Sequence, residues 1–318
     1  MGGRRVESAE VVPRGVRDDR LWAVRDIGAD VTATARRLPG LLGCTARYDG
    51  EPDEGVGPGT PWPVVITMPD GTEVHSGENA VHDRLSAVVG RAVRLTPLPA
   101  AGDRRAHRAG TLTPSVVARD LGIGRDDRLP GRRPMPLGSL LTLARYSTPP
   151  GAFHDVHPVH VLSTRTLSTL AEADPAAAVD VRRFRPTVVL ELDDDALTDL
   201  VADADAGLPE HGWSGAQLQL GGARLAVVTP TVRCVVPSRA QPGLERDVAV
   251  TRAVARRADR FTGAYADVDQ PGRVAVGDEV LLSPARPPGP LARGLDRAVG
   301  VALQQGLRLG AALEHRLR

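Results

Sequence analysis

The sequence has no lysine among its 318 residues, and all 40 of its basic residues are arginine. A site that needs a lysine amine must therefore do without one. Basic and acidic residues nearly cancel, to a formal net charge of +1. Because nucleic-acid-binding proteins usually carry a basic surplus, this balance gives no reason to expect nucleic acid as a partner.

Cysteines and long apolar stretches are also scarce. The two cysteines, Cys44 and Cys234, lie far apart and form no CxxC pair. No stretch reaches the roughly 18 apolar residues of a membrane span, and residues 1–15 lack the apolar core of a signal peptide. Two thiols without a secretory signal indicate a reducing compartment, so we expect a cytoplasmic protein with no membrane span.

Aromatic residues make up only 3% of the chain, so its core must be built from Val, Leu and Ala. Short strands dominate the first hundred residues. Residues 63–74 predict a strand, a tight turn at Pro69-Asp70-Gly71 and a second strand. Residues 79–89 have the apolar spacing of a helix, which Gly90 ends, and residues 93–98 predict another strand.

The rest of the chain divides into a broken stretch, a β-rich region and a tail. The expected elements are a long loop or linker (101–136), strands at 159–162, 216–236 and 261–282, a long strand at 181–192 interrupted by Pro186, and helices at 164–173 and 247–258. The fold class is mainly β with short helices (α+β). We expect a smaller β-barrel-like domain (1–100), a β-barrel domain (137–285) and an amphipathic C-terminal helix (286–318).

A run of arginines precedes Pro186. In the predicted strand, alternate side chains share a face, which places Arg183 beside Arg185. Two guanidinium groups projecting together can clamp a phosphate or a carboxylate. The alternative is a solvated charge run, and without further context these residues favour it.

Cys234 follows Arg233 in a predicted apolar strand. A free cysteine in such a place is most often a small buried core residue. The alternative is a thiolate stabilised by the neighbouring guanidinium, and a thiolate is a ligand for a soft metal centre. The local sequence alone favours the core role. Cys44 has no comparable partner, and we expect it to be structural.

Other polar residues gather before and after the strand at 159–162. His154, His157 and His160 recur every third residue, but Pro158 excludes a regular helix and no helical zinc motif fits, so a structural or pocket-edge role is preferred. Ser163 and Thr164 stand at a helix start. There they can cap the helix, or the exposed N–H groups of that turn can hold an anion, and the cap is the simpler interpretation.

Four separated segments resemble, in order and spacing, the MOSC family, named for the C-terminal part of molybdenum cofactor sulfurases. They are FHDVHPVHVLSTRTLSTL, DVRRFRPTVVLE, EHGWSGAQLQLGGARLAVVTPTVRCVV and FTGAYADVDQPGRVAVGDEVLL, within residues 137–284. The first hundred residues resemble the N-terminal β-barrel domain of many members, through the DDRLWAV segment. The whole arrangement is similar to the mitochondrial amidoxime-reducing component and its bacterial relatives.

The resemblance implies a molybdenum–molybdopterin cofactor with Cys234 as its metal ligand. Arg183 and Arg185 would hold its phosphate and pterin parts. Further residues that the resemblance assigns to the cofactor site are Arg20, Ser163, Thr164, Thr187 and Arg233. Family-level descriptions also include pyridoxal phosphate binding.

The chain departs from the family pattern in three ways. Members often begin with a Pro-Val-Lys-Ser strand whose Lys and Ser reach the cofactor; this chain begins after that point, so its start lies upstream or its first strand is missing. Thr187 replaces a usual asparagine and lacks the donor pair of an amide. No cluster of four cysteines follows to hold an iron–sulfur centre. Electrons would therefore come from a separate flavin or iron–sulfur protein.

These observations predict an oxidoreductase that reduces small N-hydroxylated substrates, with Asp155 as a proton or polar contributor near the site. The alternative is a carrier that binds the cofactor, or sulfur on Cys234, without turnover. The missing lysine and Thr187 favour the carrier slightly. A third alternative is a degenerate member that binds no cofactor.

Overall fold

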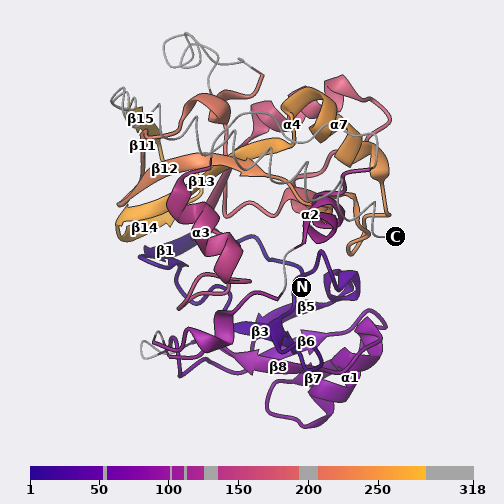
Figure 1. Ribbon diagram of the computed structural model, residues 1–318. Coiled ribbons are helices and arrows are strands. Elements are labelled where there is room, and N and C mark those ends of the chain that lie inside the picture. The colour runs from indigo at the N-terminus through magenta and orange to yellow at the C-terminus, as the bar shows by residue number, and fades with distance from the viewer. Residues whose placement is uncertain (53–55, 101, 111–112, 125–134, 193–206, 284–318) are drawn as a thin grey trace.

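A computed structural model describes residues 1–52, 56–100, 102–110, 113–124, 135–192 and 207–283. The protein is mixed α+β, as the sequence predicts, and Figure 1 shows an N-terminal unit below a larger C-terminal unit. The predicted tail helix at 286–318 lies outside the described residues. Within the described residues, no helix has both the length and the apolarity to cross a membrane.

The N-terminal unit contains two three-stranded antiparallel sheets, one of order β4-β3-β8 and one of order β5-β6-β7. Its elements are β3 (Trp22–Asp26), β4 (Val31–Thr32), η1 (Pro39–Gly43), β5 (Thr45–Tyr48), β6 (Val64–Thr67), β7 (Glu73–His75), α1 (Ala80–Val89) and β8 (Val93–Pro97). The predicted strand pair, helix and final strand are confirmed. Gly90 ends α1 with φ of 69°, and Val81 and Leu85 point into the core.

The C-terminal unit is built on one curled six-stranded sheet of order β10-β9-β13-β12-β11-β15. Its strands are β9 (Val159–Ser163), β10 (Val188–Leu190), β11 (Gln217–Leu220), β12 (Ala223–Val232), β13 (Phe261–Gln270) and β15 (Val280–Ser283). Only β9 and β10 run parallel. Leu225 and Val227, on one face of β12, are buried, as expected of a half-buried strand.

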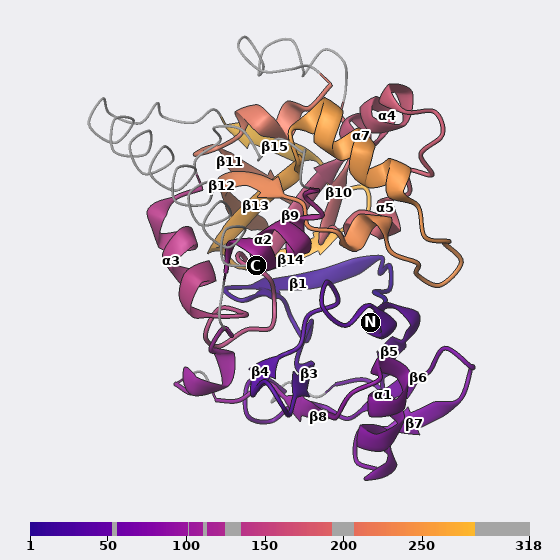
Figure 2. The ribbon, with the colours of Figure 1, turned by 45° about the vertical axis from the view of Figure 1, so that its right-hand side comes forward.

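Two helices cover the other face of this sheet (Figure 2). They are α4 (Thr164–Ala173) and α7 (Val248–Ala258), and they pack on each other. Leu162 of β9, Leu170 of α4 and Val250 of α7 share one core. The buried side of α7 also includes Val254, whereas Val248, in the first turn of the helix, is 49% exposed.

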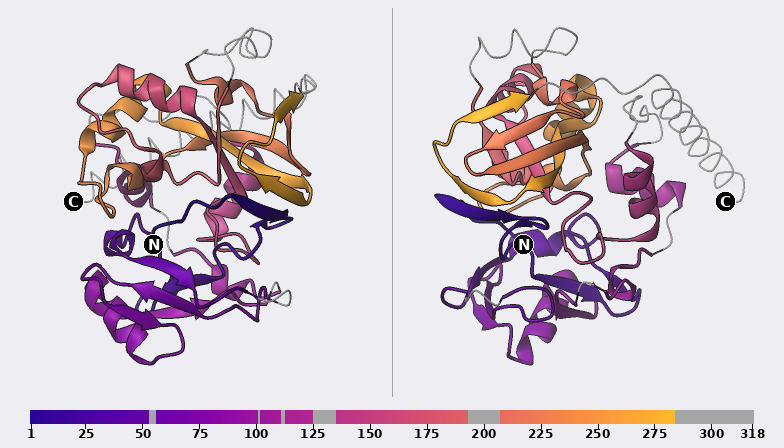
Figure 3. Two further views of the ribbon diagram at one scale, coloured as in Figure 1. Left: turned by 180° about the vertical axis from the view of Figure 1, so that it is seen from behind. Right: turned by 90° about the vertical axis from the view of Figure 1, so that its left-hand side faces the viewer.

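The first strand of the chain belongs to the C-terminal unit. β1 (Ser8–Val12) pairs antiparallel with β14 (Gly272–Ala275) and with β2 (Gly15–Val16). Figure 3 shows it running along the underside of the upper sheet, between the two units. The chain then descends to β3, so the two units share their N-terminal segment. The domain boundaries drawn from the sequence remain a prediction.

The long strand predicted over residues 181–192 is wrong. The chain forms a one-turn helix, α5 (Val181–Phe184), then turns sharply at Arg185 and enters the short strand β10. The carboxylate of Asp180 accepts a hydrogen bond from the backbone N–H of Arg182, which starts the helix. Arg185 has φ of 54°, so Arg183 and Arg185 do not share a strand face.

The long loop predicted over residues 101–136 is wrong in part. The described residues contain η2 (Arg105–His107) and α2 (Pro114–Leu121), and α3 (Leu137–Arg145) follows. Thr113 accepts a hydrogen bond from the N–H of Val116, and Gly122 ends α2 with φ of 64°. A Thr-Pro pair at the start and a glycine at the end are ordinary helix signals, so this helix was visible in the sequence.

Candidate functional site

Four arginines from different parts of the chain lie near enough to Asp155 to act on its charge. Arg20 comes from the turn before β3, Arg36 from the segment before η1, Arg185 from the turn after α5 and Arg233 from the end of β12. Burial alone would raise the pKa of the Asp155 carboxyl, but these guanidinium groups, Arg36 foremost, lower it below its usual range. The group carries four positive charges against the carboxylates of Asp155 and of Asp19, whose Oδ2 lies 3.2 Å from Nε of Arg20, so it keeps a positive surplus that suits an anionic ligand.

Asp155 does not lie in a packed core, and we call the solvent-accessible space beside it, among the four arginines, the hollow. Its side chain is exposed to solvent, although the protein surrounds it deeply enough to desolvate it. Arg20, Arg36, Arg185 and Arg233 are each partly exposed as well. A ligand can therefore reach these charged groups without unfolding the protein.

Two of the four arginines have a strained backbone. Arg20 has φ of 55° and Arg185 has φ of 54°, in the left-handed region that costs a residue with a side chain about 1–3 kcal/mol. Each stands where the chain reverses direction between two elements. Strain of this kind is retained where the surrounding structure fixes it, and it is a common feature of functional sites.

Arg233 is held by the elements around it. Its Nη2 donates to the carbonyl oxygen of Phe184 at 2.6 Å, and its Nη1 lies 3.3 Å from Nε2 of His160. The guanidinium carbon is 5.5 Å from the centre of the Phe184 ring. Nε of Arg233 is buried and has no hydrogen-bond partner among the described residues. Burial and the charge of Arg233 lower the pKa of His160 to about 3, so this imidazole is neutral.

Cys234 lies two residues beyond the end of β12, not in a strand as predicted, and it is partly exposed. Burial alone would lower the pKa of Arg36, but the charges of Asp155 and then Cys234 raise it. Burial, with Asp155 and Cys234 nearby, also raises the pKa of Tyr265. The thiol is therefore an electrostatic neighbour of the arginine group. Cys44, by contrast, is fully buried in the N-terminal core, as expected.

Arg183 has a structural role and does not face the hollow. It is 1% exposed, and among the described residues its guanidinium group donates only to backbone carbonyl oxygens. The four acceptors are Ala178 at 2.9 Å, Pro237 at 3.2 Å, Arg239 at 3.3 Å and Glu245 at 2.8 Å. These bonds fasten the loop that follows Cys234 to α5. The structure thus removes Arg183 from the predicted cofactor-binding residues.

Ser163 is also occupied within the protein. Its hydroxyl accepts a hydrogen bond from the N–H of Thr166 and caps α4, as the simpler interpretation predicts. The anion at this helix start is the buried carboxylate of Glu210, which accepts from the N–H of Ser163 at 2.5 Å and from the hydroxyl of Thr166. The N–H and the hydroxyl of Ser163 are therefore already bonded within the protein, while Thr164 is partly exposed. Thr187 accepts from the N–H of His160 at 3.1 Å.

The three histidines do not form a metal site. Among the described residues there is no group of three or more His, Cys, Asp or Glu side chains that can hold a metal ion. His154 and His160 are buried, and burial lowers the pKa of His154 to about 4. His157 lies between Ser139 and Asp267 instead.

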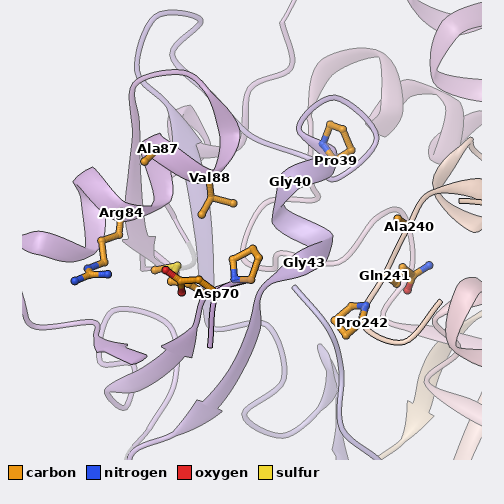
Figure 4. A pocket seen from close by; sticks show the side chains of 12 residues that line it. Pro39, Gly40, Gly43, Asp70, Arg84, Ala87, Val88, Ala240, Gln241 and Pro242 are labelled. Atoms are coloured by element: carbon orange, nitrogen blue, oxygen red, sulfur yellow. The ribbon is translucent and has the colours of Figure 1, made fainter. Parts of the chain in front are cut away.

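A separate cavity of about 700 Å³ lies between the N-terminal unit and the loop after Cys234 (Figure 4). Apolar residues of η1 and α1, such as Pro39 and Val88, line one side, and Ala240 and Pro242 line the other. It includes none of the arginines around Asp155. We place the candidate site at the arginine group, because the charge is concentrated there.

The sequence analysis missed Arg36 and Tyr265. Arg36 lies in an arginine pair after a two-residue strand, and Tyr265 is one apolar position of β13. No local pattern marks either residue, since only the folded chain brings them to Asp155 and Cys234.

The fold and the site together define a β-rich protein with a group of arginines beside a partly exposed thiol. Residues 149–281 match the model of the MOSC domain, so the chain carries a domain of the MOSC family. The match includes Asp155, Arg185, Arg233 and Cys234. No curated protein sequence matches the chain.

Two solved structures are similar to parts of the chain. The YuaD protein of Bacillus subtilis is 18% identical over 49% of this chain and 78% of its own, with a TM-score of 0.34. YiiM of Geobacillus stearothermophilus is 16% identical over 40% of this chain and 54% of its own, with a TM-score of 0.28.

Proposed function

We propose that the hollow around Asp155 binds a molybdenum–molybdopterin cofactor, with the thiolate of Cys234 as the protein's metal ligand. The observation that carries the proposal is the convergence of Arg20, Arg36, Arg185 and Arg233 beside a partly exposed cysteine within a MOSC domain. The phosphate and dithiolene of the cofactor are anionic, and guanidinium groups are suited to both. A thiolate is a suitable ligand for a soft metal.

Residues from both units of the protein would bind the cofactor. Arg20 and Arg36 belong to the N-terminal unit, and Arg185 and Arg233 belong to the MOSC domain, so an anion held by all four would join the two units. Asp155 is ionised at neutral pH, since nearby arginines lower its pKa. As a carboxylate it attracts the guanidinium groups and can accept a hydrogen bond but not donate one, which favours the polar contact over the proton donor among the roles predicted for it.

We further propose that the protein is an oxidoreductase for small N-hydroxylated substrates, with electrons from a separate flavin or iron–sulfur protein. When bound, the cofactor supplies two-electron oxygen-atom transfer at the metal. The chain contributes cofactor placement and a charged, shaped hollow. The neutral imidazole of His160 positions Arg233 and adds no charge to the site.

A carrier of the cofactor without turnover is the second candidate. Two observations favour it. The chain has no lysine, and the hydroxyl of Thr187 is already bonded to the N–H of His160 within the sheet. Fewer contacts to the cofactor would make its release easier.

Metal and pterin analysis of protein purified from a molybdate-supplied host tests the binding proposal. We expect close to one molybdenum per chain, lost in Cys234→Ala and retained in Cys44→Ala, which is the matched removal of the thiol outside the site. Wild-type protein that contains neither molybdenum nor pterin would contradict both the enzyme and the carrier.

Turnover separates the two candidates. Loaded protein is mixed with benzamidoxime or a hydroxylaminopurine and a chemical electron donor, and the reduced product is measured. Reduction that Cys234→Ala abolishes supports the enzyme. Full molybdenum loading without any reduction supports the carrier.

A further inference from the structure

A serine, a histidine and an aspartate form a continuous hydrogen-bonded chain outside the arginine group. Oγ of Ser139 lies 3.0 Å from Nε2 of His157, and Nδ1 of His157 lies 2.8 Å from Oδ1 of Asp267. Each imidazole nitrogen thus has one partner, a hydroxyl on one side and a carboxylate on the other. This is the order of contacts found in a nucleophile, its general base and the group that orients the base.

The three residues come from three separate elements. Ser139 is the third residue of α3, His157 precedes β9 and Asp267 lies in β13. The His157 ring packs on Tyr265, with 5.6 Å between ring centres, which fixes the plane of the imidazole. A Ser–His contact fixed by packing and by a carboxylate keeps the base aligned with the hydroxyl.

Ser139 lies at the N-terminal end of a helix, where the helix can stabilise negative charge. It belongs to the first turn of α3, where the helix itself offers no acceptor for the backbone N–H groups. These groups and the positive end of the helix dipole stabilise negative charge that develops near Oγ. The preceding residues, Leu137 and Gly138, are exposed, so this end of the helix faces solvent.

We propose that Ser139, His157 and Asp267 form a second active site that hydrolyses small acyl esters. Nε2 of His157 takes the proton of the Ser139 hydroxyl while Oγ bonds to the ester carbonyl carbon. The alcohol then leaves with that proton, and the acyl group stays on Oγ. Water, deprotonated by His157, releases the acid and restores the hydroxyl. No electron is transferred and no cofactor takes part.

The low exposure of Ser139 limits the size of the substrate, and the high exposure of Asp267 limits the rate. Ser139 is only 7% exposed, so the acyl group that reaches Oγ must be short. The side chain of Asp267 is 55% exposed, so water screens its effect on His157. The site is therefore a modest esterase, in which Asp267 contributes much less than a buried aspartate does.

Covalent labelling tests the proposal on the whole protein. The Cys234→Ala variant is treated with paraoxon, a small organophosphate that reacts with activated serines, and the modified residue is located by mass spectrometry. We expect diethylphosphate on Ser139 and none on Ser168, an exposed helical serine. Unlabelled Ser139 would overturn the proposal, because a serine that only fastens α3 to the sheet has no activated hydroxyl.

Ester hydrolysis gives the second measurement. p-Nitrophenyl acetate should be cleaved, and the dodecanoate should not. Ser139→Ala and His157→Gln should each lower the rate by ~100-fold or more, and Asp267→Asn by ~10-fold. Activity that survives Ser139→Ala contradicts the assignment. Because Cys234 is absent throughout, the result is independent of whether the arginine group binds a cofactor.

Discussion

At the scale of single residues, neighbours in sequence have different roles. Arg182 is exposed and bonds Asp180, Arg183 is buried among carbonyl oxygens, and Arg185 faces the hollow. The sequence shows three equivalent cations. One helical turn followed by one left-handed residue directs them to three environments, so only Arg185 is available to an anion.

Arg183→Ala should be strongly destabilising. The change removes four buried or partly buried hydrogen bonds that the Arg183 guanidinium group donates to carbonyl oxygens. We expect a loss of about 3–5 kcal/mol in the free energy of unfolding, measured by urea denaturation. Arg182→Ala is the matched control and should leave stability nearly unchanged. Equal losses in the two variants would contradict the structural role of Arg183.

Glu210 gives a prediction about pH. Burial raises the pKa of its carboxyl above the ordinary value of 4.5, although hydrogen bonds from Thr166 and Ser163 oppose the shift. The folded protein thus binds this proton more tightly than the unfolded chain, and its contribution to stability declines as the pH rises above 4.5. Glu210→Gln removes this dependence.

The loss in the free energy of unfolding that Glu210→Gln causes should therefore be smaller at pH 7.5 than at pH 4.5. Urea unfolding of both proteins at the two pH values measures the difference, and Glu172→Gln, on the exposed side of α4, serves as the control. A stability difference that does not change with pH would show that Glu210 is not buried as described.

At the scale of elements, capping and turn residues overrule strand propensity. Residues 181–192 are rich in Val and alternate like a strand, but Asp180 starts a helix and Pro186 cannot donate to a sheet. Helix α2 illustrates the same rule, since Thr113, Pro114 and Gly122 define it within a stretch that looks irregular. In both places, the short-range hydrogen bonds decided the local structure.

Gly263 shows how closely β13 approaches β9. It has φ of 76°, and a methyl group there would lie 2.5 Å from Nε2 of His160 and 2.5 Å from the carbonyl oxygen of Val161. Gly263→Ala should cost ~2–5 kcal/mol in the free energy of unfolding, because it combines backbone strain with a clash.

Gly71→Ala is the matched control for this prediction. Gly71 has φ of 84°, but no atom lies within 4 Å of the added methyl group. The strain alone should cost about 1–2 kcal/mol. Thermal or urea unfolding of both variants tests the difference, and equal losses would mean that β9 and β13 are not in close contact at Gly263.

At the scale of the whole molecule, the arginine group joins the two units. Arg20 and Arg36 come from one unit and Arg185 and Arg233 from the other, while β1 crosses to pair with β14. Without an anion, the carboxylates of Asp155 and Asp19 neutralise only part of this positive charge. Anion binding should therefore stabilise the arrangement of the two units as well as the site itself.

Inorganic pyrophosphate should raise the melting temperature of the protein. A ligand at a hundred times its Kd stabilises the folded state by about 2.7 kcal/mol, and added salt should weaken the effect. Arg36→Gln and Arg233→Gln, one from each unit, should each reduce the shift, measured by scanning calorimetry. Arg182→Gln should leave it unchanged, and a shift that persists in the first two variants would place the anion elsewhere.

Much of the local structure was readable from the sequence because its causes are local. Residues 63–74, 79–89 and 164–173 combine apolar spacing with turn, cap or glycine signals, and each forms the predicted element. Cys234 and Arg185 were identified only through the resemblance to a family, because their own segments are those of an ordinary core cysteine and a charged surface.

The sequence by itself determined the α+β class, most of the strands, the MOSC motifs and the lysine-free chemistry of the site. Tertiary structure alone decided which arginines meet at Asp155, why Arg183 is not among them, and that Arg36 and Tyr265 belong beside Cys234. The physical reason is the separation along the sequence over which each kind of interaction acts. Caps, turns and periodicity act over a few residues, whereas a charge cluster depends on how distant segments pack, and no short pattern encodes that packing.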